Sequence, residues 1–156
     1  MIRADILINN KAWKKYISNP SAYLKNRLKK AEKKITIFQK KKLSFTLLLS
    51  GNSEIKRLNK KFRKKNKSTD VLSFPFHEKN SLHKIIKENN NNNIYLGDII
   101  INLNKIIKDC KKNDILSFFD KIWIHGLVHL LGHRHKSNKD FAIMQKLENK
   151  IINSIQ

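Results

Sequence analysis

Four of the chain's six histidines lie in one run of eleven residues, 125–135. On a helix of about 3.6 residues per turn, His125 and His129 share one face because they are four positions apart. Gly132 is a natural helix stop, after which the chain can return His135 to the same point. Three neutral imidazoles suit zinc, and the lack of a fourth protein ligand leaves a position for water. We therefore predict a catalytic metal site with one zinc per chain, bound by His125, His129 and His135.

A simpler interpretation of these residues is structural. A single histidine on an apolar helix is usually a hydrogen-bonded core residue. Two histidines at helical spacing, followed by a glycine and a third histidine, favour ligation instead. His133 stays ambiguous, because it could compete for the metal or be an exposed turn residue, which is the interpretation we prefer.

The first two histidines belong to a strongly apolar segment for which Asp114 is the expected N-cap. Apolar side chains surround nearly the whole expected helix: Leu116, Phe118, Phe119, Ile122, Trp123, Leu127, Val128, Leu130 and Leu131. A helix of this kind is buried centrally and holds its ligands on a rigid element.

Strands and helices are expected to alternate along the rest of the chain. Alternating or continuous apolar patterns predict strands at 2–9, 43–49, 71–74 and 94–101, with Pro75 ending the third and Gly97-Asp98 interrupting the fourth. Helices are expected from Asn19-Pro20, after Gly51-Asn52-Ser53 with Ile55, Leu58 and Phe62 facing inward, over 103–111, and from about Asp140. This order predicts an α+β fold with a small mixed sheet of about four strands packed by helices.

The sequence shows no composition break strong enough to be a linker, so we expect one domain over residues 1–156. Residues 78–93 are polar and end in five asparagines, which indicates a mobile loop with a short helix around 82–86. The lack of a signal-peptide pattern or of an apolar run of roughly 18 residues predicts a cytoplasmic protein with no membrane segment. Cys110 is the single cysteine, so no disulfide-linked partner is expected, and it is interpreted as a core residue.

The chain is strongly basic, with a formal net charge of +22 and a pI of about 10.2. Such a charge points to a polyanionic partner, nucleic acid before membrane. Only five of the 34 basic residues are arginine, and the chain is rich in Asn and Ile, as an AT-rich genome would produce. Charge alone is therefore weak evidence for nucleic-acid binding.

Three ordered motifs resemble one known family. The histidine run is similar to the HGxLHLxGYDH signature of the YbeY family of bacterial metallo-endoribonucleases. Residues 58–63 (LNKKFR) with 69–75 (TDVLSFP), and residues 96–99 (LGDI), resemble its other conserved blocks. The resemblance implies an α+β fold and a zinc-dependent, single-strand-specific endoribonuclease. It also implies a role in 16S rRNA 3′-end maturation and late-stage 70S ribosome quality control, with rRNA and ribosomal subunits as partners.

Carried over by position, the resemblance gives His125, His129 and His135 as ligands and Arg63 as the functional arginine. Arg134 stands where the family pattern has Asp, and His133 where it has Tyr. The missing Asp calls into question a proton-transfer or ligand-supporting role for that position, but not the ligand set. A planar guanidinium can stabilise charge on a phosphate through a bidentate contact, so Arg63 is the catalytic candidate.

Two alternatives remain open from the sequence. The HxxxHxxGxxH spacing is also that of metzincin peptidases, which carry Glu after the first histidine as general base. Gly126 has no side chain to fill that role, which makes a peptidase-like hydrolase the weaker reading. The other alternative is a non-catalytic zinc-containing factor that binds RNA in ribosome assembly. The oligomeric state is not predicted.

Overall fold

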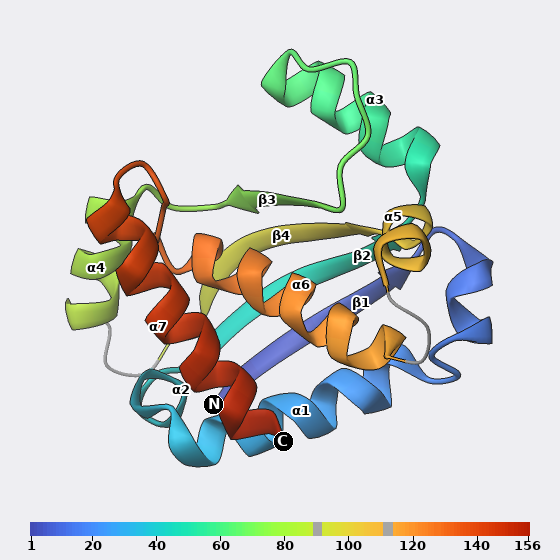
Figure 1. Cartoon of the computed structure of the whole chain (residues 1–156). Coiled ribbons are helices and arrows are strands. Elements are labelled where there is room, and N and C mark those ends of the chain that lie inside the picture. The colour runs from blue at the N-terminus through green and yellow to red at the C-terminus, as the bar shows by residue number, and fades with distance from the viewer. Residues whose placement is uncertain (89–91, 111–113) are drawn as a thin grey trace.

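The computed structural model describes residues 1–88, 92–110 and 114–156, in which strands and helices alternate (Figure 1). The strands are β1 (Ile2–Ile8), β2 (Leu43–Ser50), β3 (Val71–Pro75) and β4 (Ile94–Asn102). The helices are η1 (Lys11–Lys15), α1 (Pro20–Lys34), α2 (Thr36–Lys40), α3 (Asn52–Arg63), α4 (Lys79–Glu88), α5 (Leu103–Asp109), α6 (Ile115–Leu130) and α7 (Asn138–Ile155).

Within the described ranges the strands form one four-stranded sheet in the order β1-β2-β4-β3. The first three strands are parallel, and β3 runs antiparallel to β4 at the edge. The sheet is therefore mixed, and the α+β prediction is confirmed. Gly97 does not break β4 but forms an irregularity, with φ of 129° and a backbone so close to Phe74 O that a Cβ would lie 2.1 Å from it.

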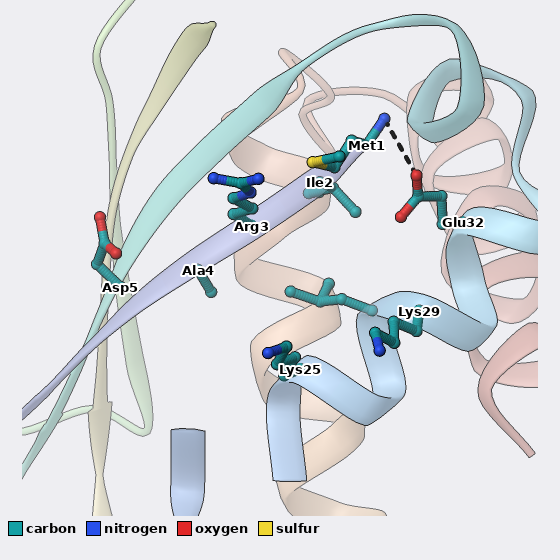
Figure 2. A pocket seen from close by; sticks show the side chains of 9 residues that line it. Met1, Ile2, Arg3, Ala4, Asp5, Lys25, Lys29 and Glu32 are labelled. Atoms are coloured by element: carbon teal, nitrogen blue, oxygen red, sulfur yellow. Dashed lines mark ion pairs between the residues drawn. The ribbon is translucent and has the colours of Figure 1, made fainter. Parts of the chain in front are cut away.

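The two faces of the sheet differ because side chains alternate along each strand. On β1, Ile2 and Ala4 point toward α1, whereas Arg3 and Asp5 point away from it (Figure 2). Helices α1, α6 and α7 cover the first face (Figure 1), where the main core lies. On the second face α3 packs over β3 and β4, forming a small cluster of Ile55, Leu72 and Ile100.

Helix α6 is the central element of the covered face. It begins at the predicted N-cap, because the Asp114 carboxylate accepts from the Ser117 N–H at 3.1 Å. Its residues Trp123, Leu127 and Val128 are fully buried, as the apolar pattern predicted. None of the described helices, α6 included, is both long and apolar enough to cross a membrane.

Gly126 lets α6 approach the sheet closely. A Cβ built there would lie 2.8 Å from Ile99 Cγ2 and 3.2 Å from Ser73 Oγ. Real Cβ contacts are longer than 3.0 Å, so any larger residue would push α6 away from β4 and β3. Gly126 therefore allows close packing of α6 on the sheet, and it directly follows His125, the first histidine of the run 125–135.

The inward orientation predicted for Phe62 is wrong. Phe62 was expected to face inward with Ile55 and Leu58, but 57% of it is exposed. Helix α3 overhangs the edge of the sheet at its C-terminal end (Figure 1), so its apolar stripe reaches past the core. Phe62 packs instead against Phe74 of β3, with ring centroids 5.2 Å apart.

The segment expected to be a mobile loop contains helix α4, ten residues long rather than a short turn around 82–86. Leu82 is fully buried in the main core, which supplies the packing that the polar composition concealed. Three of the five asparagines, 89–91, lie outside the described residues, as do 111–113 at the predicted end of α5.

Several smaller differences have local causes. Helix α7 begins two residues before Asp140, because the Ser137 hydroxyl accepts from the Asp140 N–H and caps the helix. The short helices η1 and α2 were not predicted, each being only five residues long. Cys110, expected in the core, is only partly buried, at the C-cap of α5.

The close contact at Gly126 gives a stability prediction. Gly126→Ala should lower the free energy of unfolding by about 1–3 kcal/mol, because the added methyl overpacks the α6–β4 contact. Denaturant unfolding followed by circular dichroism would measure it, with Lys121→Ala on the exposed side of α6 as the control. A variant as stable as the wild type would show that the contact is not tight.

Candidate metal centre

The three predicted histidines come together at the C-terminal end of α6. His125 and His129, one helical turn apart, have ring centroids 4.6 Å apart and Nε2 atoms 3.1 Å apart. The His135 ring centroid lies 6.0 Å from that of His125 and 5.2 Å from that of His129. One nitrogen of each imidazole lies within 4.8 Å of the other two, so the group could hold a metal ion.

The turn after α6 brings His135 back, as predicted from Gly132. This glycine has φ of 88°, a conformation that side chains resist. Its N–H donates to His129 O, and the His133 N–H donates to Val128 O. These two carbonyl groups in the last turn of α6 are therefore hydrogen-bonded. The chain then reverses toward the two helical histidines.

Hydrogen bonds fix the tautomers of the two helical histidines. His129 Nδ1 lies 2.9 Å from His133 O, and a carbonyl can only accept, so Nδ1 carries the proton. His125 Nδ1 lies 2.7 Å from the Glu148 carboxylate and is a donor for the same reason. When both rings are neutral, their Nε2 atoms therefore present lone pairs to each other.

This arrangement fits a metal ion by its donor chemistry. Two facing lone pairs repel unless a cation lies between them. With Zn–N bonds of about 2.0–2.1 Å, two ligands of a tetrahedral site are about 3.3–3.4 Å apart, close to the Nε2 separation of 3.1 Å. Acceptors on the opposite ring nitrogen are the usual support of metal-binding imidazoles.

Glu148 is the functional residue that sequence reasoning missed. It lies on α7, which packs against α6, and its carboxylate holds His125. A signal was present, because Glu148 interrupts the apolar stripe of Met144, Leu147 and Ile151 on the inward side of α7. An acid among such residues indicates a buried partner.

The preferred interpretation of His133 as an exposed turn residue is wrong. Its side chain is half-buried, and it is not in the histidine group that could hold a metal. Burial lowers the pKa of His133, and nearby Lys79 and His83 of α4 lower it further, so the side chain faces α4. Its backbone carbonyl, not its imidazole, contacts the candidate centre.

Arg63 comes to the same place from a distant part of the chain. A cleft of about 320 Å³ is lined by Arg63, Ser73, Pro75, His129, Arg134, His135 and Lys136. Its lining includes three cations, and none of the residues that line it carries a carboxylate. The Ser73 hydroxyl is buried with no hydrogen-bond partner among the described residues. Arg134, in place of the family Asp, adds to the positive charge, so the cleft suits an anion.

Buried asparagines fix the loop that follows Arg63. Lys64 takes the left-handed conformation, with φ of 58°, and its N–H donates to Asn59 O. Asn59 Nδ2 also donates to Lys67 O at 2.8 Å. Asn102 lies at the end of β4. Its side-chain Nδ2 donates to Asn52 Oδ1 and Ser68 Oγ at 2.8 Å and to Thr69 O at 2.9 Å. These contacts hold the end of α3 beside β3.

Other hollows offer less chemistry. One of about 460 Å³ lies between β1 and α1 and is lined by Arg3, Asp5, Lys25 and Lys29 among others (Figure 2). It contains no histidine, and its Glu32 carboxylate already pairs with the Met1 amino group at 3.4 Å. Charges there are mixed, so no group converges on a point.

Fold and site together define a class: α+β proteins that place a three-histidine group, able to hold a metal ion, beside a basic cleft. The chain matches the family model described as Endoribonuclease YbeY over residues 7–156, and it belongs to that family. This membership classes it as an endoribonuclease, an enzyme that cleaves RNA internally, and confirms the resemblance found in the motifs.

Individual relatives agree with this assignment. The chain is 43% identical over 159 residues to Endoribonuclease YbeY of Pelagibacter ubique, covering 100% of this chain and 97% of the relative. It is 43% identical over 112 residues to Endoribonuclease YbeY of Buchnera aphidicola, covering 70% of this chain and 66% of the relative. A solution structure from Thermotoga maritima shares the fold, with a TM-score of 0.60 and 24% identity over 99% of this chain and 89% of that one.

The environment of His129 gives a pH prediction. Burial, partly offset by the hydrogen bond to His133 O, lowers the pKa of His129 from 6.5 to about 4. Between about pH 6.5 and 4 the unfolded chain therefore binds a proton that the folded, metal-free chain does not. The free energy of unfolding should fall as pH decreases through this window, and this contribution should level off below it.

Denaturant unfolding of chelator-treated protein across this window would measure the effect. His129→Gln, which cannot titrate, should show a shallower decline than the wild type, and Lys121→Ala, on the exposed side of α6, serves as the control. Equal slopes for wild type and His129→Gln would contradict the lowered pKa.

Proposed function

We propose that this protein is a zinc-dependent, single-strand-specific endoribonuclease. Its proposed substrate is the 3′ region of 16S rRNA in ribosomal subunits, within 16S maturation and late-stage 70S quality control in the cytoplasm. The main support is the convergence of three imidazoles, two with lone pairs facing each other, beside a cleft lined by Arg63. Family membership supports the RNA substrate.

The proposal gives each residue a role. His125, His129 and His135 hold one zinc ion, while Glu148 and the His133 carbonyl keep two of the rings oriented. When bound, zinc supplies Lewis acidity and activates water near neutral pH. Arg63 reaches the cleft from α3 and pairs with the phosphate oxygens, where negative charge develops during cleavage. Arg134 and Lys136 add charge that attracts the RNA backbone.

The peptidase alternative is disfavoured by packing as well as by sequence. A general-base glutamate at position 126 would have to occupy space that Ile99 and Ser73 fill. That position also faces the sheet rather than the histidine group. The alternative of a non-catalytic RNA-binding factor predicts that removing the metal leaves RNA processing unaffected.

Metal content and activity test the proposal together. The wild type should bind about one zinc per chain, and it should cleave single-stranded RNA only when the metal is present. His129→Ala should lose most of the metal, because two remaining histidines make a poor site. Elemental analysis after desalting, with cleavage assays with and without chelator, would measure both.

His133→Ala is the matched control for this experiment, since it removes an imidazole from the same run but keeps the carbonyl that orients His129. Full zinc retention in His129→Ala, or loss only in His133→Ala, would overturn the ligand set. Cleavage unaffected by chelator would overturn the metal-dependent reaction.

Arg63 can be tested by separating rate from affinity. If Arg63 meets charge that develops only in the transition state, Arg63→Ala should lower the single-turnover rate by on the order of 100-fold. The loss of RNA affinity should be much smaller, given the net charge of +22. Arg63→Lys should restore binding better than rate, because lysine keeps the charge without the planar fork.

Arg57→Ala is the matched control, because Arg57 lies on the same helix but pairs with Glu54 at 2.7 Å and does not line the cleft. It should lower neither quantity by much. If rate and affinity fall by the same factor in Arg63→Ala and Arg63→Lys, then Arg63 is only part of the basic surface.

A further inference from the structure

The edge strand β3 presents different chemistry on its two sides. Ser73 and Pro75 line the cleft that also contains Arg63, His129 and His135, which we call the metal cleft. Phe74, between them, points to the opposite face, where its ring packs edge-on against Phe62, with centroids 5.2 Å apart. Phe76 is the residue after Pro75, and its ring centroid lies 5.6 Å from that of Tyr95 on β4. We call Phe62, Phe74, Phe76 and Tyr95 the β3 aromatic patch.

Two rings of this patch are open to solvent. Phe76 is 68% exposed and Phe62 is 57% exposed, more than any other large apolar side chain in the described part of the chain. Single exposed apolar residues are normal on a protein surface. Four aromatic rings arranged in two edge-on pairs are a more specific feature, typical of a binding surface. Packing within each pair fixes the ring orientation and leaves ring surface uncovered.

Positive charge lies beside Phe62, at one side of the patch. Lys60, Lys61, Lys64 and Lys65 are exposed next to Phe62 in the chain, and Lys61 Nζ lies 5.2 Å from the Phe62 ring centroid. Acids lie at the other side of the patch: Asp98 accepts a 2.6 Å hydrogen bond from the Tyr95 hydroxyl, Asp5 is near Tyr95, and Glu78 is two residues after Phe76. Flat aromatic rings beside lysines match the two parts of a single-stranded nucleic acid, base faces and phosphates.

The patch and the metal cleft lie on the two sides of the same edge strand, β3. Phe62 is followed by Arg63, and Phe74 and Phe76 flank Pro75, so both exposed rings are one residue from a residue that lines the cleft. Because β3 is the edge strand of the sheet, a single-stranded RNA that passes over this edge can place a phosphate in the cleft and neighbouring bases on the patch.

We propose that the β3 aromatic patch binds unpaired bases of the RNA by stacking, on Phe62 and Phe76, while the neighbouring phosphate lies in the metal cleft. The inference rests on the proposed ribonuclease function and deepens it. In a duplex both faces of each base are covered by neighbours, so stacking of this kind is available only to single strands. The patch thus supplies a physical origin for single-strand preference.

Binding of two probes tests the stacking directly. One is a short single-stranded RNA, on the order of eight nucleotides, and the other is the same sugar-phosphate chain without bases. Fluorescence anisotropy with chelator-treated protein gives affinity without cleavage. The wild type should bind the base-containing probe at least about 5-fold more tightly than the abasic probe.

Leucine variants separate stacking from apolarity and charge. Phe62→Leu and Phe76→Leu should each reduce binding of the base-containing probe by about 5-fold or more, with abasic binding unchanged. The salt dependence should also be unchanged, because no phosphate contact is lost. Phe62→Trp should keep the preference. Tyr16→Leu is the matched control, an aromatic residue 41% exposed beside η1, outside the patch.

Three results would overturn the proposal. One is equal affinity of the wild type for both probes. Another is equal weakening of both probes by the leucine variants, which would mean that the rings only support the loop carrying Arg63. The last is tighter binding of an acidic, aromatic peptide than of RNA, lost in the leucine variants, which would assign the patch to a protein partner.

The metal assay distinguishes failure of this inference from failure of the proposed function. If the protein cleaves single-stranded RNA in a metal-dependent way but binds the base-containing and abasic probes equally, only the stacking inference is refuted. If it binds the base-containing probe more tightly but shows no metal-dependent cleavage, the patch is still an RNA-binding surface and the proposed reaction is refuted.

Discussion

The close packing of α6 on the sheet at Gly126 is the constraint on which the rest of the site depends. With no side chain at this position, the helix lies against Ile99 and beside Ser73, on strands β4 and β3. His125 precedes the contact and His129 follows it within one turn, so both rings reach the end of the helix that opens into the cleft. The same contact sets the position of β3 relative to the histidines. A shift of α6 would therefore change the distance from the histidines to Ser73 and Arg63 together.

Much of the fold could be predicted from periodicity because the core is laid out in regular stripes. Alternation in β1, the apolar run of β2 and the largely apolar α6 each had one reasonable interpretation, and Asp114 indicated the start of α6. Local pattern could not show that α4 is anchored by the buried Leu82, with the partly buried Ile85 and Ile86 packed beside it, since most of that helix is polar. Nor could it show that α3 extends past the sheet, so that Phe62 has no core to enter.

The candidate site divides in the same way. The grouping of His125, His129 and His135 could be predicted because helical spacing and one glycine determine it locally. The placement of Arg63 in the same cleft required the sheet to bring α3 and α6 together, and only the family resemblance indicated it. Glu148 and the His133 carbonyl could not be assigned, because each depends on a tertiary contact or on a backbone atom whose direction no residue type reveals. Ligation by the histidines and catalysis by Arg63 stay proposals.

The three histidines lie within eleven residues, on one helix and its closing turn. The opposite wall of the cleft comes from β3 and α3, at least fifty residues earlier in the sequence. Contacts that close a short segment form at little entropic cost, and those that join distant segments depend on the whole sheet. The histidine group and a complete cleft are thus separable features of this chain. A molecule with a loosened β3 edge could keep its histidine group intact, and its metal content would then report on one helix rather than on the finished enzyme.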